Sequence, residues 1–309
     1  MSQIITITLN PALDKSIVVP ELVPDKKLRA VSAEVDPGGG GINVSRALHK
    51  LGCASEAVFL SGGYTGKYLE ELLLKEGVMM HPLPTKEPTR ENFVVFDDEK
   101  KLQYRFGMEG PRVSEAEWKA VLDYTASRKG ITYIVASGSL PPGVPVDFFG
   151  RLAAIAKNLR AKLFVDTSGE ALKYAVKEGV YMIKPNLGEL GSLYGKQKLS
   201  QEEIISAAQK VITGGGCEVM VVSMGSAGAM LFTANEQYQA KPPKVTVLSN
   251  VGAGDSMVAG MICALSQGRS WKEILRYGVA AGTAATLHPG TELCKKEDTE
   301  QIFTLLNQD

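Results

Sequence analysis

Short β-branched segments alternate with segments of helical periodicity along most of this chain. The predicted strands lie at residues 4–9, 56–60, 131–136, 162–166, 180–184 and 218–223, and the predicted helices at 44–51, 66–76, 115–127, 146–158 and 201–212. This alternation predicts an open, mostly parallel, doubly wound α/β sheet covered by helices on both faces. Ligands of such sheets bind beyond the carboxyl ends of the strands, so we expect the site in the turns that follow strands.

Two segments do not fit the alternation. Residues 13–35 hold two short strand-like runs, Ser16–Val19 and Leu28–Val31, and residues 90–107 resemble a hairpin of Glu91–Phe96 and Leu102–Gly107. We expect both to form a small β lid, from insertions at about 13–35 and 88–108, on a single α/β domain of residues 1–309. An exposed sheet needs a cover for its apolar face, which predicts a homodimer through the lid.

Composition excludes several classes of partner and site. Lys and Arg total 34 and balance 34 Asp and Glu, so no overall field favours nucleic acid or an anionic membrane. No apolar run is long enough to span a membrane and no leader pattern is present, so we expect a cytoplasmic protein. The cysteines form no Cys-x-x-Cys pair and are expected to be unpaired apolar residues in a reducing compartment: Cys53, Cys217, Cys263 and Cys294.

The segment Gly252-Ala253-Gly254-Asp255 opens a helical pattern. The first N–H groups of a helix have no internal partner and carry the positive end of the helix dipole, and glycines let a phosphate reach them. Asp255 at this point can accept a proton from an attacking hydroxyl while the amides hold a phosphoryl group. The alternative is that Asp255 only complements the helix dipole.

Four consecutive glycines, residues 38–41, precede Ile42-Asn43 and another helical pattern. So many glycines are entropically costly, and close approach of the backbone to a ligand is the simplest explanation. Asn43 can donate and accept hydrogen bonds, which suits sugar hydroxyls. A flexible hinge is the alternative, and neither a dinucleotide fingerprint nor a P-loop is present.

Basic residues gather on the expected lid. If the hairpin turn centres on Asp98–Glu99, Arg105 lies opposite Asn92 and shares a face with Arg90. Two guanidinium groups on one face can bind a phosphate, whereas solvated edge residues are the alternative. The basic residues of the lid are Lys26, Lys27, Arg29, Arg90 and Arg105.

Three further strand ends carry polar or small residues. Lys184, Asn186 and Glu189 follow a predicted strand, where the carboxylate can hold Mg²⁺ through water and the amide can reach a phosphate. Glu189 is alternatively a first-turn helix carboxylate. The other two segments are 137–143, which includes Ser139, and 223–228; Ser270-x-x-Glu273 is a capping box.

Taken together and in this order, these segments resemble the ribokinase-like PfkB family of sugar kinases over essentially the whole chain. Asp14, with Arg90 and Arg105, resembles the phosphosugar branch. The resemblance implies ATP- and Mg²⁺-dependent phosphorylation of a ketohexose monophosphate, in the first place fructose 6-phosphate to fructose 1,6-bisphosphate. Tagatose 6-phosphate and fructose 1-phosphate are the alternative substrates.

The resemblance also implies residue roles. Asp255 would be the catalytic base and the amides of Gly252, Ala253 and Gly254 the anion hole. The sugar hydroxyls would contact Asp14, Gly38, Gly39 and Asn43, and the sugar's phosphate Lys27, Arg90, Arg105 and Ser139. ATP would lie along Lys184, Asn186, Ser223, Gly225 and Gly228, with Mg²⁺ near Glu189. A monovalent cation such as K⁺ would lie near Ser249, Val251, Ala285 and Gly290, although Asn250, His288 and Glu292 depart from the family pattern.

Two other functions compete with this interpretation. A Rossmann oxidoreductase would carry its glycine fingerprint after the first strand, where Leu9-Asn10-Pro11-Ala12 has no glycine. A phosphosugar sensor without activity would have no need of Asp255 beside an anion hole.

Overall fold

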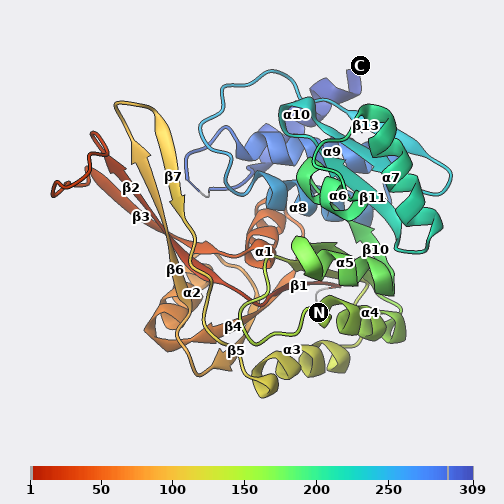
Figure 1. Ribbon diagram of the computed structural model, residues 1–309, viewed down its shortest axis with the longest axis horizontal. Helices are drawn as coiled ribbons and strands as arrows, with labels where there is room; N and C mark the ends of the chain where they lie inside the picture. The colour runs from red at the N-terminus through yellow and green to blue at the C-terminus, as the bar shows by residue number, and fades with distance from the viewer. Residues whose placement is uncertain (1–2, 291, 309) are drawn as a thin grey trace.

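The computed structural model describes residues 3–290 and 292–308 and contains one large sheet with helices on both faces (Figure 1). Its strand order is β13-β12-β11-β10-β9-β8-β1-β4-β5, and the pairs are parallel except those of β12 with β11 and β13. The doubly wound α/β prediction is confirmed. The strands are β1 (Ile4–Thr8), β4 (Glu56–Gly62), β5 (Met80–Thr85), β8 (Tyr133–Ser137), β9 (Lys162–Asp166), β10 (Val180–Ile183), β11 (Cys217–Ser223), β12 (Ala229–Phe232) and β13 (Gln237–Ala240).

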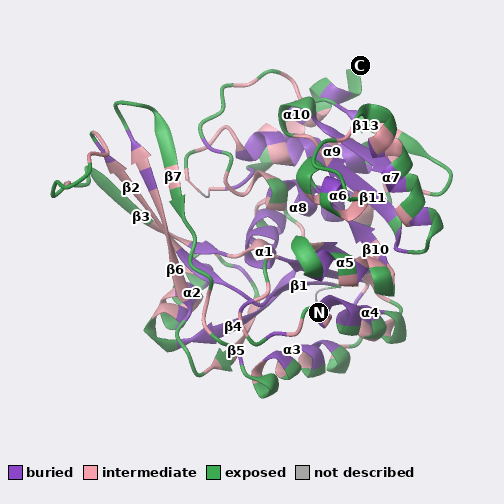
Figure 2. Ribbon diagram, viewed as in Figure 1, coloured by how far each residue is buried: buried purple, intermediate pink, exposed green. Residues whose placement is uncertain are grey.

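Successive side chains of the central strands bury into opposite layers, because strand side chains alternate between faces. Ile5 and Ile7 pack with one layer of helices and Ile4 with the other. Figure 2 shows the resulting buried strands between helices whose outer faces are exposed. The first layer holds α3 (Glu115–Ser127), α4 (Phe148–Leu159), α5 (Gly169–Glu178), α6 (Leu187–Tyr194) and α7 (Gln201–Thr213); the second holds α1 (Gly40–Lys50), α8 (Ala253–Ser266), α9 (Trp271–Ala285) and α10 (Lys296–Gln308).

A second sheet of four strands, in the order β3-β2-β6-β7, projects from the large one (Figure 1). We call it the lid sheet; its strands are β2 (Ala12–Val19), β3 (Ser32–Gly38), β6 (Arg90–Asp97) and β7 (Leu102–Phe106). The strand expected at Leu28–Val31 is wrong, because those residues lie in the connection and β3 begins at Ser32. Near the base of the lid sheet, α2 (Gly63–Lys75) packs with residues of β2 and β4.

The register of the β6–β7 hairpin differs from the expected one. Arg105 lies opposite Val94 and not opposite Asn92. The shift is two residues, so Arg105 still shares a face with Arg90, since side chains repeat every two residues.

Two of the four cysteines are paired, which corrects the expectation of unpaired cysteines. Cys53, just after α1, and Cys263, on α8, form a disulfide. The pair is 210 residues apart in sequence, and only the packing of α1 against α8 brings it together. Cys217 and Cys294 are free and buried. Among the described residues, the longest helices fall short of the length and apolarity that a membrane crossing needs.

Candidate active site

The amino end of α8 presents free amides next to Asp255. Gly252, with φ 73°, is the N-cap, and the first helical hydrogen bond runs from Ser256 N–H to the Gly252 carbonyl at 2.8 Å. Among the described residues, no acceptor takes the N–H groups of the predicted anion hole, Gly252, Ala253 and Gly254, or that of Asp255. Gly254 is exposed, so an anion can approach these amides directly.

Asp255 is held by side chains from two other elements. Asn43 Nδ2, on α1, donates to Asp255 Oδ2 at 3.0 Å, and Ser137 Oγ, at the end of β8, donates to Oδ1 at 3.5 Å. Burial and the nearby charge of Asp166 raise the pKa of Asp255 to about 7, against the lowering effects of Asn43, Lys184 and Ser137. A carboxylate with a pKa near neutral is suited to accept a proton.

The glycines at 38–41 approach the protein's own chain closely. A Cβ at Gly40 would overlap Ser137 Oγ, and one at Gly38 would overlap the carboxylate of Asp14. Gly39, with φ 112°, is the N-cap of α1. The glycines therefore let α1 begin against the ends of β1 and β8, which brings Asn43 to Asp255.

Asn43 keeps an unused acceptor, because its Oδ1 is buried and has no hydrogen-bond partner in the described part of the chain. Asp14, on β2, lies against Gly38, and its Oδ1 accepts a hydrogen bond from Asn92 Nδ2 at 2.9 Å. Burial raises the pKa of Asp14, opposed by Asn92 and Arg90. Asn43 and Asp14 are thus acceptors that suit sugar hydroxyls.

Arg90 is fixed by backbone carbonyls. It donates to Asn10 O at 2.9 Å, to Pro11 O at 3.4 Å and to Met108 O. Three of its five N–H groups are used, which leaves two for a ligand.

The other basic lid residues lie apart from Arg90. Arg105, on β7, lies opposite Val94, which is four residues or about 13 Å from Arg90 along β6 at about 3.3 Å per residue. Its guanidinium donates to Gln103 Oε1 at 3.0 and 3.2 Å. Lys27 is exposed in the connection between β2 and β3, at the far end of the lid sheet. The chain by itself does not bring Lys27, Arg90 and Arg105 to one point.

Lys184, after β10, is buried and pairs with Asp166 Oδ1 at 3.3 Å. Burial opposes its charge, but Asp166 and Asp255 outweigh that effect and raise the pKa of Lys184. Asp166, the last residue of β9, was not among the predicted site residues. Its signal is a carboxylate at the carboxyl end of a strand, the position where ligands of this fold class bind.

Asn186 and Glu189 form a capping box at the start of α6. Asn186 Oδ1 accepts from Glu189 N–H at 2.9 Å, and Glu189 Oε2 accepts from Asn186 N–H at 2.8 Å. Glu189 is therefore a carboxylate in the first turn of a helix, which was the alternative to a magnesium ligand in the sequence-based prediction. Burial and the charge of Asp166 also raise its pKa, so two like charges face each other and a cation would fit between them.

Strands β10 and β11 bring the expected ATP residues side by side. Ser223 N–H donates to the Pro185 carbonyl at 3.0 Å, and the backbones of Asn186 and Ser223 form an isolated parallel β-bridge. Gly225 has open space around its Cα. Gly228 instead is buried, and a Cβ there would overlap the Ala240 carbonyl. The packing of the chain therefore requires a glycine at this position, whether or not ATP binds nearby.

The four residues expected near a monovalent cation lie on segments that meet. Ser249 Oγ donates to the Gly290 carbonyl at 2.9 Å and accepts from Val251 N–H at 3.1 Å. The Ala285 carbonyl accepts from His288 N–H at 3.4 Å, and Thr286 O accepts from Leu248 N–H. These carbonyls are the ligand type that hard cations prefer.

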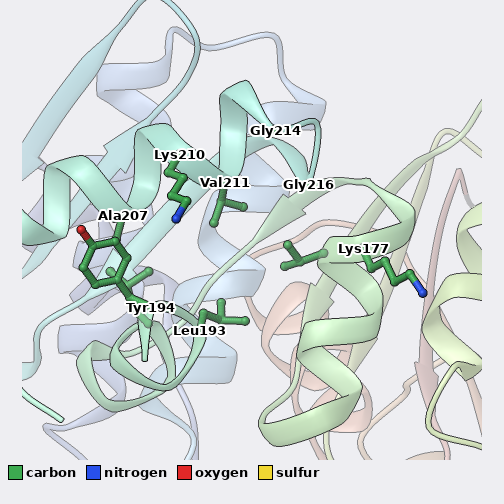
Figure 3. Close-up of a pocket in the computed structure, with 10 residues that line it drawn as sticks. Lys177, Leu193, Tyr194, Ala207, Lys210, Val211, Gly214 and Gly216 are labelled. Carbon is green, nitrogen blue, oxygen red and sulfur yellow. The ribbon is translucent and has the colours of Figure 1, made fainter. Parts of the chain in front are cut away.

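A pocket of about 330 Å³ lies elsewhere, between α5, α6 and α7 (Figure 3). Lys210 lies over the ring of Tyr194 there, and Lys177 points away from them. The residues that line this pocket include neither a carboxylate nor any residue expected in the site. The candidate site residues around Asp255 lie outside this pocket.

Comparisons with known proteins show the family of the chain. A family model described as pfkB family carbohydrate kinase matches residues 6–298. The chain is 41% identical over 304 residues to ATP-dependent 6-phosphofructokinase isozyme 2 of Mycobacterium tuberculosis, covering 98% of this chain and 89% of that protein. It is 39% identical to the isozyme 2 of Escherichia coli over the full length of both. It is 34% identical to 1-phosphofructokinase of Bacillus subtilis, covering 97% of each.

Solved structures of Escherichia coli phosphofructokinase-2 have the same fold. The complex with substrates and products superposes with a TM-score of 0.95 at 39% identity, covering 98% of this chain and 99% of that one. The complex with potassium has a TM-score of 0.95 at 39% identity, covering 99% and 100%. The tetrameric inhibited form has a TM-score of 0.93 at 38% identity, covering 99% and 100%.

Proposed function

Because this chain belongs to the pfkB family of carbohydrate kinases, we propose that it transfers the γ-phosphoryl group of ATP to the 1-hydroxyl of fructose 6-phosphate. It is an ATP-dependent sugar-phosphate kinase of the 6-phosphofructokinase type. One observation carries the proposal: Asp255, with a pKa near neutral, lies among unpartnered helix amides and is oriented by Asn43 and Ser137.

In the proposed reaction, Asp255 accepts the proton of the 1-hydroxyl as its oxygen attacks the γ-phosphorus. The new bond is oxygen to phosphorus, and the bond to the bridging oxygen of ADP breaks. The amides of residues 252–255 and the ammonium of Lys184 stabilise charge on the transferred group. Asn43 and Asp14 orient the sugar through its hydroxyls, so that position and charge supply most of the rate.

Asp166 and Glu189 are proposed to hold Mg²⁺, because their carboxylates repel each other where a phosphate chain would pass. When bound, the ion would neutralise charge on the phosphates of ATP. The carbonyls near Ser249 and Gly290 are proposed to hold K⁺, supported by the potassium complex of the Escherichia coli relative.

The lid sheet is proposed to join two copies of the chain in a cytoplasmic homodimer. Its two faces differ in character. By register, one face carries Asp14, Arg90 and Arg105, and the other carries Phe93 and Phe106, the latter 50% exposed. The apolar face is proposed to pack against the same face of a second copy of the chain.

The test is the initial rate of ADP release with four sugars at matched concentrations. They are fructose 6-phosphate, tagatose 6-phosphate, fructose 1-phosphate and fructose. We expect the highest kcat/KM with fructose 6-phosphate. A lead by fructose 1-phosphate would favour the activity named for the Bacillus subtilis relative, and a lead by fructose would remove the phosphate role of Arg90.

A further inference from the structure

Asn10 joins three parts of the site, although it takes no direct part in the proposed reaction. The residue follows β1 and is 3% exposed. Its Nδ2 donates to Ser139 Oγ at 3.0 Å and to the Glu109 carbonyl at 2.9 Å. Its own carbonyl accepts from Arg90 Nη2 at 2.9 Å. Asn10 therefore touches both Ser139 and Arg90.

The surroundings determine which way the Asn10 amide points. The Glu109 carbonyl can only accept, so the amide nitrogen must face it, and the second N–H then goes to Ser139. Asn10 Oδ1 points the other way, is buried against Gly110, and has no partner in the described part of the chain. A reversed amide would set two oxygens against each other at Glu109.

This orientation fixes the role of the Ser139 hydroxyl. Its oxygen accepts a hydrogen bond from Asn10, so its own proton is free to be donated elsewhere. Ser139 is exposed, so a ligand can reach that proton. An anionic oxygen is the partner that such a donor favours most.

Asn10 also helps to fix the segment that returns from the lid sheet. Glu109 is bound through its carbonyl to Asn10, while Met108 binds Arg90 through its carbonyl and Asn92 Oδ1 through its N–H at 3.0 Å. The plane of the Arg90 guanidinium is thereby set, with two N–H groups left over.

We infer that Asn10 is a positioning residue for the phosphate that the sugar substrate already carries, because it directs the free proton of Ser139 and supports Arg90. This inference rests on the proposed function and on the contacts of Ser139 and Arg90 with that phosphate, which the family resemblance implies. The side chain of Asn10 acts through Ser139, and the substrate itself contacts Ser139.

A double-mutant cycle tests the inference, with Asn10→Ala, Ser139→Ala and the double variant. Each single variant is expected to raise KM for fructose 6-phosphate about tenfold, with kcat and KM for ATP within about twofold of wild type. Because Asn10 acts through Ser139, the double variant should match Ser139→Ala within about twofold. Inhibition by inorganic phosphate, a probe without the sugar, should weaken in parallel, whereas KM for unphosphorylated fructose should not change.

Asn10→Asp keeps the shape of the side chain and serves as a second variant if Asn10→Ala folds poorly. Its carboxylate must accept from Ser139, which takes the free proton away and adds a like charge near the phosphate. We expect a larger rise in KM for fructose 6-phosphate than in Asn10→Ala, with the melting temperature recorded for both.

Additive effects of Asn10→Ala and Ser139→Ala, or an equal loss for fructose and fructose 6-phosphate, would overturn the inference in favour of a structural role. Failure of the proposed function gives a different result. In that case Arg90→Met and Ser139→Ala leave KM for fructose 6-phosphate unchanged, or wild type shows no preference for the phosphosugar.

Discussion

At the scale of single residues, the chemistry depends on how Asp255 is charged. Its carboxylate lies near the like charge of Asp166 and the opposite charge of Lys184, and burial disfavours ionisation. The result is a base whose pKa is about 7. A base of this strength works best close to neutral pH.

Replacing Asp255 by Asn should lower kcat by about 10²- to 10⁴-fold, because the proton acceptor is lost while the amides that hold the phosphoryl group remain. ATP binding, measured by calorimetry, should be nearly unchanged. A variant that retains near-normal kcat would show that Asp255 is not the base.

The same substitution should stabilise the fold at high pH. The folded protein holds the Asp255 proton up to a pKa of about 7, above the ordinary value of 3.8, so wild-type stability from this group falls as pH rises between those values. We therefore expect Asp255→Asn to melt higher than wild type at pH 8. The difference should shrink toward pH 4, and equal melting temperatures at all pH values would contradict the raised pKa.

The pH profile of kcat/KM should shift in opposite directions in two neighbouring variants. In wild type kcat/KM should fall as pH drops through about 7, because the base must be ionised. Lys184→Met removes a charge that lowers the Asp255 pKa, so the acidic limb of the profile, where kcat/KM falls as pH drops, should move to higher pH. Asp166→Asn removes a charge that raises it and should move the limb to lower pH. A limb that stays in place in both variants would assign the titration to another group.

At the scale of elements, the site depends on α1 and α8 lying side by side. One helix supplies Asn43 and the other supplies Asp255, and the disulfide between Cys53 and Cys263 joins them toward their other ends. Both helices pack on the same face of the large sheet. The relative position of these helices decides whether Asn43 reaches the base.

Reducing the disulfide should lower the free energy of unfolding by about 2–5 kcal/mol, because a cross-link over so long a loop restricts the unfolded chain. The measurement is the melting temperature with and without a thiol reductant. Cys53→Ser with Cys263→Ser is the control and should melt at the same temperature in both conditions. Four free thiols in the unreduced, denatured protein would contradict the cross-link.

The sequence was informative about elements where a local pattern decides the structure. The alternation of strands and helices, and the capping box at Ser270 and Glu273, depend on nearby residues and were confirmed. Strand β5 was missed because Pro82 and Pro84 resemble a loop, although an edge strand tolerates proline. The Cys53–Cys263 pair was missed because tertiary packing alone creates it.

The site was predictable only in part, for a similar reason. Asp255, Asn43 and Lys184 stand in marked local segments, and the structure brings them together. Asp166 had only a weak sequence signal, its position at the carboxyl end of a strand, and its charge matters because Lys184 and Asp255 lie nearby. How Arg90 uses its N–H groups depends on carbonyls at residues 10, 11 and 108, which no spacing rule connects.

At the scale of the whole molecule, the large sheet is poorly suited to pair with another chain. One edge is β5, with its two prolines, and the other is the four-residue strand β13. Short edges and prolines block strand addition. The apolar face of the lid sheet is thus the surface we expect copies of the chain to share.

Phe106→Asp should convert the proposed dimer into a monomer, since it places a charge on that apolar face. Light scattering after size exclusion gives the mass. Gln103→Asp, on the opposite face of the same strand, is the matched control and should remain dimeric. A Phe106→Asp protein that keeps the dimer mass would place the interface elsewhere.

The hydrogen bond from Asn43 to Asp255 joins residues that are 212 positions apart. During synthesis, Asn43 leaves the ribosome long before Asp255 has been translated, so the base cannot be oriented until most of the chain has been made. A chain whose translation stops before Asp255 therefore lacks the proposed base, even where its amino-terminal part contains Asn43.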